Sequence, residues 1–127
     1  MKQPVDLARR FLSLAERDFK AFRKLAGDSE IDDEIVGFHA QQTVEKCLKA
    51  VLAKHRVEVR KTHDLIELLA LLEKNHLPGP PNVNEIKNLN PFAVMLRYDF
   101  NEHETLDRAR AQRAVEAMLA WAKAEIR

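Results

Sequence analysis

The sequence predicts an all-α fold, an up-and-down bundle of four to five helices that forms one domain over residues 1–127. Apolar residues recur at helical spacing along most of the chain. Only three glycines and five prolines interrupt a composition that is 46% hydrophobic. A chain of 127 residues is long enough to bury one hydrophobic core and too short for two domains of ordinary size.

The first two helices are expected to be long. The first should cover residues 5–26, with Gly27 as its stop signal. Its buried side is Ala8, Phe11, Leu12, Ala15, Phe19 and Phe22. The second should begin at Asp32 or Asp33, either of which can cap it, and continue to about His55. One broad arc of this second helix is mostly apolar and holds Val36, Ala40, Thr43, Val44, Cys47, Leu48 and Val51.

A third helix follows a connector at residues 56–61. Thr62 is suited to be its N-cap, and Asp64 in the first turn would complement the helix dipole. The helix should end near Asn75, before the proline-rich break at residues 77–81. Its core side is Leu65, Ile66, Leu68, Leu69 and Leu72.

The last third of the chain predicts an interrupted helix and a long final one. Asn84 can cap the fourth helix, and Pro91 should interrupt it because proline lacks the donor and clashes with the preceding turn. Asn101 and Glu104 have the spacing of a capping box, which predicts a last helix running to about Ile126. Its buried side is Ala111, Val115, Met118, Trp121 and Ala122.

The charge balance excludes a strongly basic protein that coats polyanions. Lysine and arginine number 21 against 20 acidic residues, a net charge of +1, so contact with nucleic acid requires a local patch. The densest basic region is Lys54, Arg56, Arg60 and Lys61, opposed only by Glu58. It is suited either to hold RNA phosphates or to be a solvated loop. No aromatic residue is interleaved with it, so base stacking is not indicated there.

Several classes of protein are excluded or disfavoured by simple counts. Cys47 is the only cysteine and lies on the apolar arc, which predicts a buried structural thiol and leaves no zinc framework. No apolar run approaches the length of a membrane span, and the N-terminus leads directly into an amphipathic pattern, so a cytoplasmic protein without membrane contact is expected. Neither a glycine-rich phosphate loop nor a metal-binding histidine pair is present. We therefore expect no cofactor and no metal.

A polar row lies opposite the apolar arc of the second helix. At about 100° per residue, its members fall within roughly 80° of one another; they are His39, Gln42, Lys46 and Lys49. This set is suited to bind anions or to form a self-complementary interface. The other interpretation is the ordinary solvent-exposed face of an amphipathic helix. For His63, beside Thr62 at a helix start, a structural role is favoured over a ligand role.

Three motifs together resemble a known family. The second helix reads FHAQQTVEKCLKAVL over residues 38–52, and Thr62-His63-Asp64-Leu65 opens the next helix. A proline-containing helix then ends in Leu96-Arg97-Tyr98-Asp99. This order is similar to that of the HEPN domain, a small helical domain of prokaryotes and higher eukaryotes. The resemblance spans nearly the whole chain.

The resemblance implies a homodimer that pairs with a nucleotidyltransferase-type protein as a toxin–antitoxin system. Many such domains are metal-independent ribonucleases with an Arg-x(4–6)-His motif, and Arg97 and His103 match it with five intervening residues. In another branch Arg-Tyr leaves the helix and no histidine is required, a pattern that Tyr98 also fits. The alternative is therefore a non-catalytic module that binds a nucleotide or a partner, using His39, Gln42, Lys46, Lys49 and Tyr98.

Catalysis places a geometric condition on Arg97 and His103. On one continuous helix, residues six apart lie about 9 Å along the axis and about 120° around it, so the two side chains would not converge. They converge only if the helix breaks between them or if two protomers share a site. Histidine can then exchange protons with the reacting oxygens, and arginine can bind the phosphate oxygens.

Overall fold

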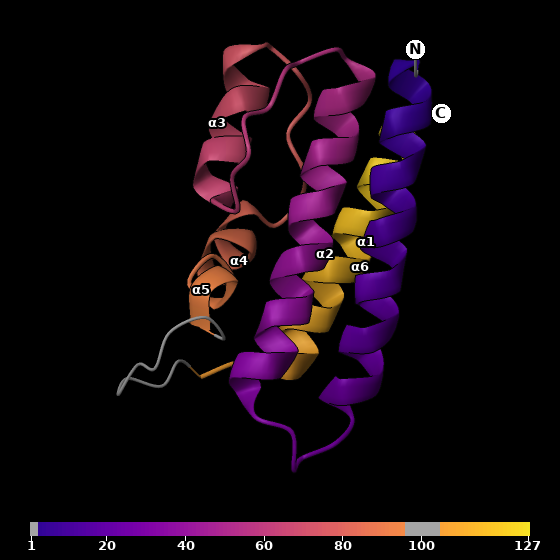
Figure 1. The fold of residues 1–127 in the computed structure, drawn as a ribbon. Helices are drawn as coiled ribbons and strands as arrows, with labels where there is room; N and C mark the ends of the chain where they lie inside the picture. The colour runs from indigo at the N-terminus through magenta and orange to yellow at the C-terminus, as the bar shows by residue number, and fades with distance from the viewer. Residues whose placement is uncertain (1–2, 96–104) are drawn as a thin grey trace.

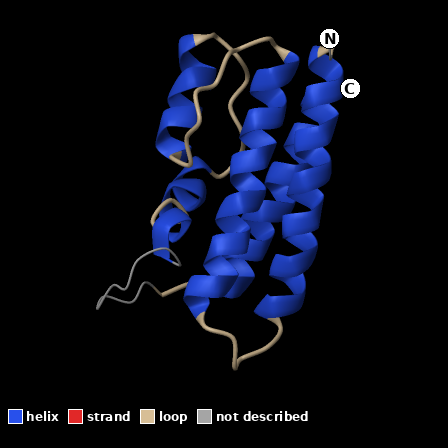
Figure 2. Cartoon of the chain, in the orientation of Figure 1, coloured by secondary structure: helices blue, strands red, loops and turns tan. Residues whose placement is uncertain are grey.

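The computed structural model describes residues 3–95 and 105–127 and confirms the all-α prediction (Figures 1 and 2). Six helices and no strand are found in these two stretches. The helices are α1 (Pro4–Ala26), α2 (Asp33–Lys54), α3 (Leu65–Lys74), α4 (Val83–Asn88), α5 (Phe92–Met95) and α6 (Arg108–Glu125). None of them combines the length and the apolar content that crossing a bilayer requires.

Helix α2 is the centre of the bundle. It packs against α1 and α6 on one side and against α3 and α5 on the other, as Figure 1 shows. For this reason α2 is buried around most of its circumference, including the polar residues Gln41, Gln42, Thr43 and Glu45. The sequence predicted a helix with one buried side. The structure instead has a central helix with layers on two sides.

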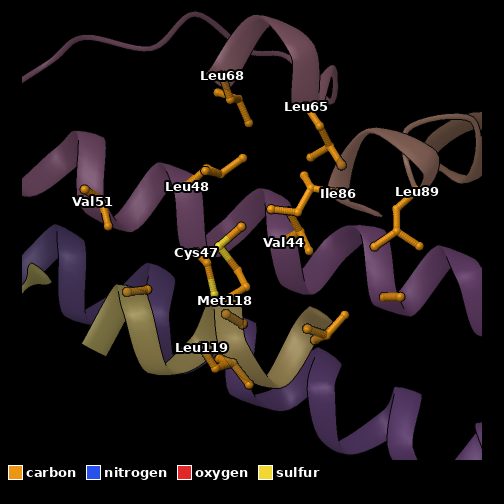
Figure 3. Close-up of a cluster of buried hydrophobic side chains, with 14 of the residues drawn as sticks. Val44, Cys47, Leu48, Val51, Leu65, Leu68, Ile86, Leu89, Met118 and Leu119 are labelled. Atoms are coloured by element: carbon orange, nitrogen blue, oxygen red, sulfur yellow. The ribbon is translucent and has the colours of Figure 1, made fainter. Parts of the chain in front are cut away.

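The core is built around the middle of α2. In Figure 3 the side chains of Val44 and Leu48 point toward Leu65 and Ile86, while Met118 approaches from α6. All of these side chains are fully buried. Such packing fixes the relative positions of the helices, since burying these apolar side chains together removes them from water at close packing.

Cys47 of α2 belongs to this core, and its side chain lies beside Met118 of α6 (Figure 3). Burial raises the pKa of its thiol far above the ordinary value. The prediction of a buried structural thiol is therefore confirmed. One other core prediction was wrong, because Ile66 is 44% exposed. Trp121 is partly buried and packs against the core.

The start of α3 differs from the prediction by two residues. Asp64, not Thr62, is the N-cap, and its carboxylate accepts a hydrogen bond of 2.9 Å from the backbone N–H of Ile66. Thr62 instead accepts from the backbone N–H of Asp64 and donates to Glu67. Helix α4 is likewise preceded by Asn82 and not by Asn84.

Helix α6 begins later than predicted. Residues 105–107 are not helical, and the side chain of Asp107 caps the helix by accepting 3.0 Å from the backbone N–H of Arg110. The prediction that Asn101 caps the last helix was therefore wrong. The physical reason is that Arg108, in the first turn, binds the start of α2 and the loop before it. Its guanidinium donates to the carboxylate of Asp33 at 2.9 Å and to the carbonyl oxygen of Asp28 at 2.9 Å.

Candidate functional site

The polar row predicted on α2 forms two separate clusters in the structure. The first joins α2 to α1 through Asp18. His39 Nδ1 lies 3.3 Å from one carboxylate oxygen of Asp18, and Lys46 Nζ donates to the other. The three side chains are 27%, 22% and 16% exposed for His39, Lys46 and Asp18. The charges of Lys46 and Asp18 are therefore matched within the chain and partly removed from water.

The second cluster surrounds the carboxylate of Glu45, which is 4% exposed. Lys49 Nζ donates to it at 3.1 Å, and His63 Nδ1 lies 3.0 Å from it. Gln41 donates to Glu45 at 3.2 Å and to the backbone carbonyl of His63 at 3.0 Å. Gln42 completes the cluster by donating to the side-chain oxygen of Gln41 at 2.7 Å. This network connects α2 to the segment that opens α3.

The prediction of a displayed polar row was wrong, because Gln42 is buried and Lys49 is only 14% exposed. Each of the four predicted side chains already has a partner in the chain. Sequence reasoning missed the acidic residues that organise both clusters. The position of Glu45, four residues before Lys49, was a usable signal for an ion pair. Asp18 offered none, since its partners lie on another helix.

Arg97, Tyr98 and His103 lie outside the described residues. The two flanks of their segment, however, are both attached to the first turns of α2. On one flank, Phe92 of α5 is buried against Gly37; a Cβ atom at Gly37 would lie 2.3 Å from the Phe92 ring. On the other, Asp33 accepts hydrogen bonds from the backbone N–H of Leu106 at 3.2 Å and from Arg108.

The geometric condition for Arg97 and His103 stays a prediction, because both residues lie outside the described stretches 3–95 and 105–127. Helix α5 is described up to Met95, and α6 begins at Arg108. Neither helix, as described, contains Arg97 or His103.

The basic region predicted after the second helix divides into two parts. Lys54 turns toward the C-terminus, where it donates to the backbone carbonyl of Glu125 at 3.1 Å. Arg56, Arg60 and Lys61 line a cleft of about 640 Å³ between the start of α1, the end of α2 and the connector to α3. Across residues 3–95 and 105–127, no group of three or more histidine, cysteine, aspartate or glutamate side chains is arranged to hold a metal ion.

Comparison with known families decides the classification. The sequence model of the HEPN domain matches residues 8–125, nearly the whole chain. This chain belongs to the HEPN domain family. Its fold is also similar to the crystal structure of an archaeal HEPN homologue, with a TM-score of 0.60, 21% sequence identity and complete coverage of both chains. Among curated proteins no match was found.

In this HEPN domain, buried polar contacts join the central α2 to the opening of α3. The resemblance inferred from FHAQQTVEKCLKAVL and Thr62-His63-Asp64-Leu65 is confirmed by the family match. The contact between Glu45 and His63 shows that these two motifs meet in space. Ribonuclease activity, toxin–antitoxin pairing and dimerisation remain predictions.

Proposed function

We propose that this HEPN protein is a metal-independent endoribonuclease, the toxin of a cytoplasmic toxin–antitoxin pair whose other member is a nucleotidyltransferase-type protein. The observation that carries the proposal is the attachment of both flanks of the Arg97–His103 segment to one end of α2. Phe92 packs on Gly37, and Leu106 and Arg108 bind Asp33. A catalytic segment needs such anchoring, because reacting groups must be held in position by rigid elements.

The chemistry assigned to this segment needs two groups. His103 would accept the proton of a ribose 2′-hydroxyl or donate one to the departing 5′-oxygen, since imidazole titrates near neutral pH. Arg97 would bind the phosphate oxygens, on which negative charge accumulates in the transition state. The attack forms a bond from the 2′-oxygen to phosphorus and breaks the bond to the 5′-oxygen. A homodimer would bring two such sets to one cleft.

The alternative, a non-catalytic nucleotide- or partner-binding module, was based on the polar row of α2. The structure does not favour it, because those four side chains bind Asp18, Gln41 and Glu45 within the chain. A ligand at this row would have to displace the partly buried ion pairs of Lys46 with Asp18 and of Lys49 with Glu45. Breaking one such pair leaves the other charge uncompensated, which is costly.

The test is an RNA cleavage assay in excess chelator. The wild-type chain is expected to cleave a mixed RNA, and Arg97→Ala and His103→Ala are expected to reduce the rate at least about 100-fold. His55→Ala is the matched control, because His55 is an exposed histidine at the other end of α2. Circular dichroism confirms that each variant is folded. A wild-type chain that is a folded dimer and cleaves no RNA would overturn the proposal.

Pairing with the second protein needs its own measurement. Co-expression with a nucleotidyltransferase encoded beside this chain is expected to give a complex in which RNA cleavage is suppressed. Light scattering on the isolated chain is expected to give twice the 14.6 kDa mass of one protomer. A monomeric mass at assay concentration, or undiminished cleavage in the presence of the second protein, would contradict the corresponding part of the proposal.

A further inference from the structure

A second feature of interest is the cleft at the C-terminal end of α2. The cleft introduced above, here called the basic cleft, has apolar walls that come from two places in the sequence. Leu7 and Phe11 extend from the first turns of α1, and Val57 and Val59 lie on the connector. Leu7 is 40% exposed, so part of the apolar wall faces solvent. The volume of the basic cleft, about 640 Å³, is within the range of small-molecule sites.

The cations of the basic cleft differ in how far they are already neutralised. Lys49 binds the carboxylate of Glu45, and Arg60 binds Glu67 at 2.7 Å. Arg56 and Lys61 have no ion-pair partner within residues 3–95 and 105–127. The same lining includes the carboxylate of Glu58. Arg56 and Lys61 together outweigh its single negative charge, so positive charge beside the apolar wall is available to a ligand.

Arg56 occupies a backbone position that glycine adopts more easily. Its φ is 60°, in the left-handed region, at the end of α2. The turn is closed by hydrogen bonds of 3.0 Å from the N–H of Arg56 to Ala53 and from the N–H of Val57 to Leu52. The geometry is that of a helix C-terminus at which glycine is the usual residue. An arginine there is unfavourable for the backbone and places a guanidinium at the cleft.

We propose that the basic cleft binds a small amphiphilic anion, an apolar body that carries one phosphate or carboxylate group. The apolar body would contact Leu7, Phe11 and Val57, and the anionic group would bind Arg56 and Lys61. Inorganic phosphate alone would leave the apolar walls in water. A nucleic-acid backbone would need a longer row of free cations than these two.

The basic cleft is separate from the segment that carries Arg97 and His103. It lies at the C-terminal end of α2, whereas the described residues on either side of that segment, Phe92 and Arg108, contact the N-terminal turns of the same helix, whose two ends can be followed in Figure 1. A helix of 22 residues is about 33 Å long. The proposal therefore stands independently of the ribonuclease activity.

Isothermal titration calorimetry tests it with four probes: AMP, adenosine, dodecanoate below its micellar concentration, and inorganic phosphate. AMP or dodecanoate is expected to bind the wild-type chain. Binding of AMP would identify a ligand with an aromatic body, and binding of dodecanoate would identify a ligand with an aliphatic body. Adenosine and phosphate alone are expected to bind at least about tenfold more weakly, because each lacks half of the ligand.

The decisive variant is Arg56→Gly, which suits the backbone and removes the cation. It is expected to fold at least as well as wild type and to lose binding at least about tenfold, as is Lys61→Ala. His76→Gly is the matched control, because His76 has φ 57° at the end of α3 and does not line the basic cleft. The proposal is overturned if no probe binds, if phosphate binds as well as AMP and dodecanoate, or if Arg56→Gly binds like wild type.

Discussion

Nδ1 of His63 lies 3.0 Å from the carboxylate of Glu45, a contact between residues 18 positions apart. It connects the centre of α2 to the segment that opens α3. Because Glu45 also accepts from Lys49 and Gln41, one buried carboxylate organises several polar groups. Such a network is stabilising only while every member remains partnered.

We therefore expect Glu45→Ala to lower the free energy of unfolding by about 3 kcal/mol, because it leaves Lys49 with a partly buried and unpaired charge. Urea denaturation followed by circular dichroism measures the loss. Glu73→Ala is the matched control, since Glu73 is exposed on α3, and a change within about 0.5 kcal/mol is expected there. Equal effects of the two variants would contradict a structural role for the Glu45 cluster.

The close approach of Gly37 to Phe92 leads to a second prediction. Gly37→Ala places a Cβ atom 2.3 Å from a ring that is 1% exposed and cannot move freely. We expect a net loss of about 1–2 kcal/mol, since the clash exceeds the gain in helix propensity of alanine over glycine. Thermal denaturation checks this result. Gly79→Ala is the control and should hardly change the stability, because there is open space around Gly79. Adding Phe92→Leu to Gly37→Ala should restore part of the lost stability, because leucine is smaller and has no ring.

Arg108 gives a third prediction because its planar guanidinium binds several acceptors at once. Besides Asp33 and the carbonyl of Asp28, it donates to the carbonyls of Ala26, at 3.2 Å, and Ile31. A lysine ammonium cannot reproduce this fork. Arg108→Lys is expected to lower stability by about 1–3 kcal/mol.

RNA cleavage by the Arg108→Lys variant should also fall, because Arg108 anchors one flank of the proposed catalytic segment. Arg113→Lys is the control, as Arg113 is an exposed arginine of the same helix. If Arg108→Lys matches Arg113→Lys in both stability and cleavage, the anchoring role is refuted.

Glu67 gives a prediction for pH. Hydrogen bonds from Arg60, and then from Thr62, lower the pKa of Glu67 below its ordinary value of 4.5. Its ionised form therefore stabilises the fold above pH 4.5, and this contribution is lost as the pH falls through the lowered pKa. An NMR titration of the Glu67 carboxyl group should give a midpoint below 4.5. Arg60→Ala should move that midpoint upward, and an unchanged midpoint would exclude Arg60 as the cause.

The sequence predicted α1 and α2 closely, because their apolar residues repeat over six turns and their ends carry clear signals such as Asp32 and Gly27. It did not predict which polar residues would pair. The contacts of Asp18 with His39 and Lys46 depend on how α1 packs against α2, and no local pattern encodes that. The start of α6 was mispredicted for the same reason, since Arg108 is held by carbonyl groups of a distant loop.

The contacts around the candidate site could not be predicted from the sequence either, because they join residues that are distant along the chain. Arg97 and His103 were proposed from motif spacing alone, whereas the contacts of the described residues on either side, Leu106 with Asp33 and Phe92 with Gly37, follow only from the fold. The basic cleft combines the connector with the first turns of α1, so its aromatic wall at Phe11 is remote in sequence from Arg56. The sequence next to Arg56 holds no aromatic residue, but the fold brings Phe11 to the same cleft.

The most direct test of the proposed ribonuclease is the chemistry of the product ends. Wild-type protein and His103→Ala are incubated with a defined RNA in excess chelator, and the fragments are analysed by mass spectrometry. The mechanism predicts 2′,3′-cyclic phosphate and 5′-hydroxyl ends with wild type, and intact RNA with His103→Ala. Fragments with 3′-hydroxyl and 5′-phosphate ends, or equal cleavage by the folded variant, would contradict it.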